Sequence, residues 1–307
     1  LYYQKAKNNW EISVGLKKIF WGVTESIHLV DIINQTDQVE SFDGEQKLGQ
    51  PMVHYSVFTN AGTFDLFYLP YYRKRAFPGE KSRLRFSVVV DDDSVRFRNS
   101  NEEWHQDFAF RWSHSVGIFD LGLSHFYGTG REPIIIDPPP GTQSIYDFFF
   151  YDVINQTGAD VQVTHGAFLW KVESIMRFSD LQDMFAFAGG LEYTFGNVNG
   201  NGLDIGVLGE YLYDDRDELA LSNAQNDIFA GCRIALNDVQ STQILFGGLF
   251  DLDRSSNVFS VEASRRIGSN WKVEAEGRIL TEVKDQEFIL SQFKQDSFVR
   301  LALFRYF

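Results

Sequence analysis

The residues whose types and spacing best suit chemistry are charged side chains that recur at every second position. In the stretch 271–279, Lys272, Glu274, Glu276 and Arg278 alternate with Trp, Val, Ala, Gly and Ile residues. Ions of both signs on one wet face of an extended segment can attract or exclude charged solutes. In a dry core such ions are costly unless each is paired. The spacing therefore predicts a water-filled interior, and it leaves open whether the charges select solutes or only form ion-pair ladders that brace a wall.

The histidines are the other candidates for chemistry, and none of them lies in a recognisable Ser/His/Asp motif. The single Cys232 allows no internal disulfide, and no Cys/His spacing suggests a zinc site. No phosphate loop or dinucleotide fingerprint occurs. The sequence therefore predicts no enzyme activity, no cofactor and no metal site, with a histidine-dependent surface hydrolase as a minor alternative. The histidines are His28, His54, His105, His114, His125 and His165.

The elements that must position the alternating charges are β-strands, because successive side chains of a strand point to opposite faces. The same alternation recurs along most of the chain, in segments about as long as a tilted strand needs to cross a bilayer. The fold class predicted is all-β. The expected strands are 1–6, 10–21, 51–59, 63–72, 104–114, 117–128, 158–164, 167–178, 183–196, 203–214, 227–236, 240–251, 256–266, 270–280 and 297–307.

The composition separates two interpretations of this alternation. A soluble β-sandwich would place the apolar face of each strand in its core, whereas a transmembrane barrel would turn that face to lipid. Aromatic residues reach 16% while the formal net charge is −14, and Trp or Tyr recurs near strand ends, as in aromatic girdles. No apolar run approaches ~18 residues, so a transmembrane helix is excluded, and a spanning chain must be a closed barrel. The acidic balance argues against nucleic acid.

The connections between the expected strands alternate in length, which favours the barrel. The long connections 22–50, 73–103 and 129–157 all fall at one end, as the extracellular loops of transmembrane barrels do. The stiff, apolar loop 129–157 is expected to fold inward and narrow the lumen. Fifteen strands is an odd number, so we expect an additional strand before Leu1 and a single domain, 1–307, of about 16 strands; a hairpin at 83–98 would give eighteen.

The last residues, Phe298 to Phe307, read FVRLALFRYF and form an expected strand that ends on an aromatic residue. This ending resembles the C-terminal strand of Gram-negative outer-membrane β-barrels, with Arg305 where an apolar residue is usual. The phrases GLKKIFWG at 15–22 and EYLYDDR at 210–216 resemble functionally uncharacterised members of the porin-like group. The resemblance implies an outer-membrane location, contact with lipid and lipopolysaccharide, and recognition of Phe307 by the barrel-assembly machinery.

The function expected is a porin-like channel for passive diffusion of small hydrophilic solutes. The alternative is a structural or partner-binding barrel with a plugged lumen, in a homo-oligomer or an envelope protein complex. The charged face of the strands supplies the candidate pore lining. Its residues are Lys17, Asp107, Arg111, Lys171, Glu173, Arg177, Glu192, Asp204, Glu210, Arg233, Glu262, Arg266, Lys272, Glu274, Glu276 and Arg278.

Overall fold

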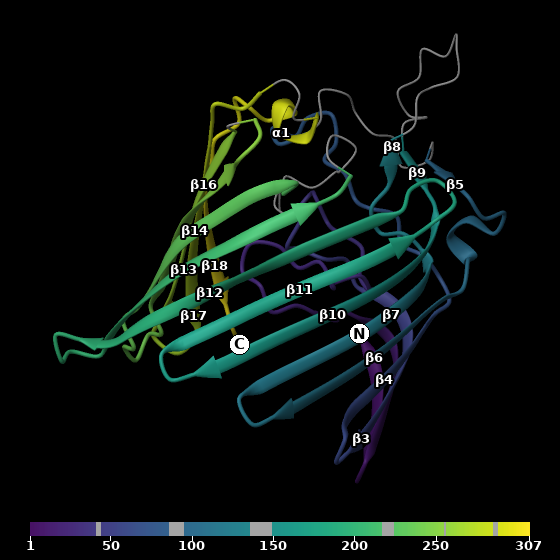
Figure 1. Ribbon diagram of the computed structural model, residues 1–307, viewed down its shortest axis with the longest axis horizontal. Coiled ribbons are helices and arrows are strands. Elements are labelled where there is room, and N and C mark those ends of the chain that lie inside the picture. Colours follow the sequence, from purple (N-terminus) through teal and green to yellow (C-terminus); the bar gives the residue numbers. More distant parts are fainter. Residues whose placement is uncertain (41–43, 86–94, 136–148, 217–223, 255, 285–287) are drawn as a thin grey trace. The chain divides into compact units, whose positions relative to one another are not determined.

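The computed structural model describes residues 1–40, 44–85, 95–135, 149–216, 224–254, 256–284 and 288–307. Fifteen strands form one antiparallel sheet in which strands adjacent in the chain are adjacent in space (Figure 1). The predicted all-β class and the fifteen strands are thus confirmed. The strands are β1 (Tyr2–Lys7), β2 (Trp10–Lys17), β3 (Gln50–Thr59), β4 (Gly62–Leu69), β6 (Asp107–Val116), β7 (Phe119–Thr129), β10 (Val153–His165), β11 (Phe168–Phe178), β12 (Met184–Val198), β13 (Leu203–Asp214), β14 (Asn226–Ala235), β15 (Gln243–Asp251), β16 (Asn257–Ile267), β17 (Trp271–Thr281) and β18 (Phe298–Arg305).

The smaller elements lie in the longer connections. Strands β5 (Arg96–Phe97), β8 (Ile134–Ile135) and β9 (Phe149–Tyr151) form a separate three-stranded sheet. A 3-10 helix, Glu102–Trp104, precedes β6, and a short helix, α1 (Phe288–Gln292), precedes β18. Among the described residues, no helix has the length and apolarity needed to span a membrane.

The longest connections are alternate ones, as predicted, but several strand boundaries differ. The strand expected at 10–21 ends at Lys17 and the one expected at 63–72 ends at Leu69, while those expected to begin at 104 and 240 begin at 107 and 243. Short turns at 8–9, 60–61, 117–118 and 166–167 alternate with long segments such as 18–49. Strand β10 starts at Val153 rather than 158, because its first polar residues, Asn155 and Thr157, belong to the strand. Strand β18 ends at Arg305 rather than at the final residue.

Two predictions extend beyond the described residues. Residues 136–148 of the expected inward loop and 86–94 of the expected hairpin are outside the described part of the chain. The pairing order runs from β1 to β18, and within the described strands no pairing that closes the sheet is detected. Closure by a strand before Leu1 therefore stays a prediction.

The two faces of the sheet differ in the way that the alternation predicts. In β13, Val207 and Tyr211 are 51% and 40% exposed, whereas Glu210 and Asp214, which point to the opposite side, are each 4% exposed. We call the side of Val207 and Tyr211 the apolar face and the side of Glu210 and Asp214 the polar face. A water-soluble sandwich buries its apolar face. In β13 these apolar side chains are exposed and these charged side chains are covered.

By contacts between Cα atoms, the chain divides into two compact units. Unit 1 comprises Leu1–Val23, His28–Val161 and Glu173–Ala186; unit 2 comprises Thr24–Ile27, Gln162–Val172 and Phe187–Phe307. Strands β10, β11 and β12 contribute residues to both units, and each unit has its own buried apolar cluster.

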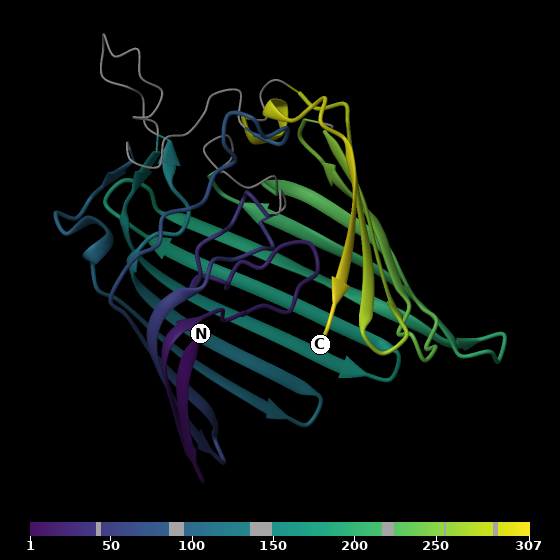
Figure 2. The ribbon, with the colours of Figure 1, turned by 180° about the vertical axis from the view of Figure 1, so that it is seen from behind.

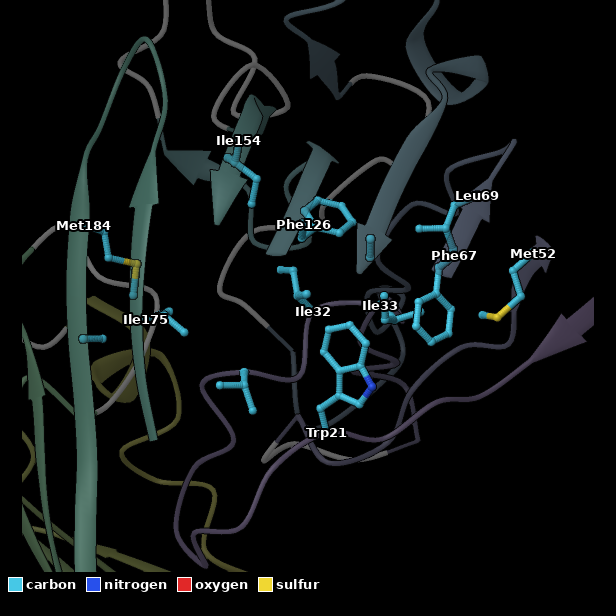
Figure 3. Packing of buried hydrophobic residues seen from close by; sticks show 13 residues of the cluster. Trp21, Ile32, Ile33, Met52, Phe67, Leu69, Phe126, Ile154, Ile175 and Met184 are labelled. Atoms are coloured by element: carbon cyan, nitrogen blue, oxygen red, sulfur yellow. The ribbon is translucent and has the colours of Figure 1, made fainter. Parts of the chain in front are cut away.

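The core of unit 1 forms where the 18–49 segment lies against the polar face. Trp21, Ile32 and Ile33 of the segment pack with side chains from the strands, among them Phe67 and Phe126 (Figure 3). The rings of Trp21 and Phe67 meet edge to face at 5.5 Å between centroids. Figure 2 shows the segment, drawn in purple, passing across the strands. Burial of these apolar side chains holds the segment in place, since each contributes about 1.5–3 kcal/mol.

The core of unit 2 is smaller. Leu208, Leu212 and Phe229 are buried on the polar face, and Ile27 from the 18–49 segment packs against them. The ring of Phe229 lies directly over Gly247, where an added Cβ would stand 2.6 Å from the ring. A glycine at this position therefore makes room for the aromatic ring on the neighbouring strand.

Candidate functional site

The residues predicted to line a pore all lie on the polar face of their strands, opposite the exposed apolar side chains. Their surroundings differ from those expected for an open lining. In both units, several of them bind the 18–49 segment, and most of the others contact another charged or polar side chain nearby. The site is therefore a charged face whose carboxylates and cations are largely engaged, with a chain segment attached to it.

Glu173 anchors the segment in unit 1. Its carboxylate is fully buried and accepts hydrogen bonds from the backbone N–H groups of Val23, at 2.6 Å, and Val30, at 3.2 Å. Gly22 adopts φ +143°, and a Cβ there would stand 3.0 Å from Glu173 Oε1. A carboxylate that accepts two backbone N–H bonds stabilises the turn between those residues, because these N–H groups have no strand partner.

His28 lies between two carboxylates. Its Nδ1 is 3.9 Å from Glu173 Oε1 and its Nε2 is 3.6 Å from Glu45 Oε1. Burial lowers the pKa of His28, but the interactions with Glu173 and Glu45 outweigh it and raise the pKa to about 10. His28 is therefore a cation at neutral pH, and it offsets the charge of the buried Glu173.

Glu210 performs the corresponding role in unit 2, where it holds residues 24–27, which we call the tip. Its two carboxylate oxygens accept from the backbone N–H of Glu25, at 2.7 Å, and from the N–H and Oγ of Ser26, at 2.8 and 2.6 Å. Three donors thus converge on one carboxylate that is itself 4% exposed. The tip is attached by polar contacts as well as by Ile27.

Glu25 of the tip reaches two cations of the polar face. Its Oε2 lies 2.6 Å from Arg233 Nη2 and 3.3 Å from Lys171 Nζ. Burial raises the pKa of Glu25, but attraction to Arg233 and Lys171 outweighs it, so the pKa falls below its usual value. Two residues predicted to line a pore therefore share one carboxylate from the segment as an ion-pair partner.

Two ion pairs on the polar face span an intervening strand. Arg111 of β6 forms two hydrogen bonds with Asp160 of β10, at 2.8 and 2.9 Å, across β7. Gly122 of β7 lies beneath this pair, and a Cβ there would stand 2.4 Å from both carboxylate oxygens. The arrangement recurs where Glu192 of β12 meets Arg233 of β14, at 3.4 Å, across β13.

Gly206 of β13 lies beneath the Glu192–Arg233 pair, as Gly122 lies beneath the Arg111–Asp160 pair. A Cβ at Gly206 would stand 2.4 Å from Glu192 Oε1. In both cases glycine allows ions from the two flanking strands to meet. Arg111 also lies over the ring of Trp21, at 5.2 Å, so it contacts the 18–49 segment.

The beginning of the connection between β7 and β10 also binds the 18–49 segment. Arg131 is buried; it donates to Asp107 Oδ2 at 2.8 Å and to the carbonyl of Ile33 at 3.1 Å. Asp107 also accepts from the N–H of Thr129 and contacts His105 Nδ1. The inward fold expected of 129–157 stays a prediction, because residues 136–148 lie outside the described part of the chain. In unit 1 the 18–49 segment covers the polar face, and Arg131 helps to fix it.

The remaining charges form pairs along the strands. In β16 to β18, Arg278 binds Glu262 at 2.8 Å and lies 3.7 Å from Glu276, which in turn lies 3.7 Å from Arg300. Lys272 pairs with Glu274 at 2.6 Å. These contacts form the ion-pair ladder that the sequence allowed as an alternative to solute selection.

Two of the three further candidates are also engaged. Arg177 binds Glu132 at 3.1 Å and Gln156 at 2.9 Å. Asp204 accepts from Asn197 and Asn237 near the β12–β13 turn. Arg266 is exposed on β16, where it lies opposite Lys272 of β17.

A cluster of polar side chains surrounds His54 on β2, β3 and β4. Lys17 Nζ is 2.8 Å from Ser13 Oγ and 3.2 Å from His54 Nδ1; His54 Nε2 is 2.8 Å from Asp65 Oδ1 and 3.0 Å from Ser56 Oγ. A hydrolytic triad needs the acid and the nucleophile on opposite ring nitrogens. Here both lie at Nε2, and Ser56 donates to Asp65. The cluster is therefore a polar bridge between strands.

Sequence reasoning missed Glu25, Ser26, His28 and Asp160 as members of the site. The available signal was the stretch from Phe20 to Ile33, whose apolar residues are unusual for a loop in water. An apolar connection must pack on another part of the chain, and this holds for 20–33 as well as for 129–157.

Within the described part of the chain, no group of three or more His, Cys, Asp or Glu side chains is arranged to hold a metal ion. Compared with known proteins, the chain matches no protein-family model, and no curated protein resembles it closely enough to count as a match.

Proposed function

We propose that the chain is a porin-like β-barrel of the outer membrane of a Gram-negative bacterium, through which small hydrophilic solutes diffuse. The observation that carries this proposal is the pattern of the two faces of the sheet: large apolar side chains are exposed on one face, and the charged side chains lie on the other, where many of them are buried. A lipid-facing wall with a polar interior requires this pattern. Exposed apolar surface on this scale marks a membrane or a partner.

In this proposal the 18–49 segment restricts the route of the solute. It occupies part of the polar face and neutralises cations there. The lining left for the solute includes the ladder on β16 to β18, whose ions are only partly covered. Lipid and lipopolysaccharide contact the apolar face, and the assembly machinery reads the C-terminal segment, β18 and the residues after it up to Phe307.

Single-channel recording tests the proposal. The purified chain, folded in detergent, is added to a planar lipid bilayer, with heat-unfolded protein as the control. We expect discrete conductance steps from the folded protein alone. A folded, bilayer-inserted protein that gives no steps refutes the channel.

A second candidate, a plugged barrel that binds a partner in an envelope complex, is favoured by the extent of the covering. Trp21 and Ile33 are nearly or fully buried, as expected of a packed core rather than of a loop beside an open pore. The double variant Glu173→Ala/Glu210→Ala removes both carboxylate anchors and distinguishes the two candidates. If the wild type gives no conductance steps and the double variant does, the result supports the plugged barrel. Co-purification in mild detergent then shows whether a partner is bound.

A further inference from the structure

The tip of the 18–49 segment brings five charged groups together in unit 2. Glu25 contacts Lys171 and Arg233, and Glu192 contacts Arg233 from the other side, while Glu210 holds the tip by its backbone. Three carboxylates thus share two cations. The local charge is negative, in a protein whose formal net charge is −14.

The cations of this group are not available to a passing anion. Arg233 is contacted by carboxylates on both sides, at 2.6 Å from Glu25 and 3.4 Å from Glu192. Lys171 faces Glu25 at 3.3 Å. The attraction to the two cations keeps Glu25 ionised, because it lowers the pKa of that carboxyl below its usual range. Without the charge of Glu25, the two cations would balance Glu192 and Glu210, and the net charge of the group would be zero.

We propose that this group makes the channel prefer cations over anions, and that Glu25 determines the preference because its charge turns a balanced group of two cations and two carboxylates into a net negative one. The inference rests on the proposed channel function. Charged rings in a polar passage select by the sign of their net charge. One unit charge at several ångströms in a watery passage changes the occupancy of a small ion by a factor of about two to five.

The test is the reversal potential of the full chain in a planar bilayer that separates two KCl concentrations. We expect a potassium-to-chloride permeability ratio above one for the wild type and a ratio about two- to five-fold lower for Glu25→Gln. Glu103→Gln is the matched control, because Glu103 also pairs with a lysine, Lys74 at 2.7 Å, but lies outside the polar face. This control should leave the ratio unchanged.

A second variant separates charge from displacement of the tip. Glu25→Gln combined with Arg233→Gln restores the local net charge, so the permeability ratio should return toward the wild-type value. If Glu25→Gln lowered the ratio only by detaching the tip, the second substitution would not restore it. Conductance with a wild-type ratio at or below one, or a ratio unaffected by Glu25→Gln, overturns the preference and leaves the channel standing. A folded protein without conductance overturns the channel, and the preference with it.

Discussion

Replacing Glu173 with alanine removes the acceptor of two backbone N–H groups in the 18–49 segment. The carboxylate is fully buried and binds the N–H of Val23 at 2.6 Å and that of Val30 at 3.2 Å. It also faces the cationic ring of His28. The variant therefore leaves two buried donors without their acceptor, and it leaves His28 with Glu45 as its remaining carboxylate neighbour.

The magnitude follows from the hydrogen bonds lost. A hydrogen bond to a charged group contributes about 1.5–3 kcal/mol, so losing two of them weakens the attachment of the segment by about 3 kcal/mol or more. Each 1.4 kcal/mol is a factor of ten in an equilibrium constant. The population of the locally opened segment should thus rise by about 100-fold, while the strands of the sheet keep their pairing.

Amide hydrogen exchange measures this opening residue by residue. We expect exchange at 19–36 to accelerate by about 100-fold in Glu173→Ala, with exchange in β16 and β17 unchanged. Glu192→Ala is the matched control, since Glu192 is also buried on the polar face and pairs with Arg233 rather than with the segment. Equal exchange at 19–36 in the two variants would refute the assignment of Glu173 as an anchor.

Three further outcomes are expected. Gly122→Ala places a Cβ 2.4 Å from the carboxylate oxygens of Asp160. Overpacking of this kind costs about 1–3 kcal/mol, so the urea unfolding midpoint should fall. A midpoint equal to that of the wild type would contradict the close approach. The pKa of His28 is raised from about 6.5 to about 10, so its stabilisation of the segment is complete below the lower value and is lost as the pH rises through the higher one. Proteolysis of 18–49 should therefore increase toward pH 10, and His28→Gln should abolish that increase; an unchanged pH profile in the variant would exclude His28 as the cause. Val261→Arg, on the apolar face, should impair insertion into lipid vesicles, because Arg near the bilayer midplane costs about 2–4 kcal/mol. Ser264→Arg on the polar face of the same strand lies opposite Glu274 and should insert normally; equal insertion of both variants would argue against a lipid-facing wall.

The C-terminal strand illustrates a feature that the sequence left unexplained. Arg305 stands where the resemblance to outer-membrane barrels leads one to expect an apolar residue. In the structure its guanidinium lies over the rings of Trp271, at 5.3 Å, and Phe307, at 4.8 Å. The long apolar stem and the planar cation of arginine both suit an aromatic face. This contact involves a residue of the neighbouring strand, so the local sequence could not indicate it.

The sequence by itself determined the strands and their faces. A period of two along 183–196 or 270–280 places every second side chain on one side, whatever the rest of the chain does. This is why the assignment of Glu192, Glu210 and Arg278 to one polar face agrees with the structure. The positions of the short turns were predictable for the same reason, because these turns separate adjacent segments of alternating residues.

Only the tertiary structure decided what covers that face. The attachment of Val23 to Glu173 joins residues 150 positions apart, and that of Glu25 to Glu210 joins residues 185 positions apart. Local periodicity carries no information about such pairs, because it reports the direction of a side chain and not the partner it meets. The pairs that cross an intervening strand depend likewise on Gly122 and Gly206, whose missing side chains matter only once three strands lie together. The 18–49 segment thus became the covering element through long-range packing, which no stretch of the sequence expresses alone.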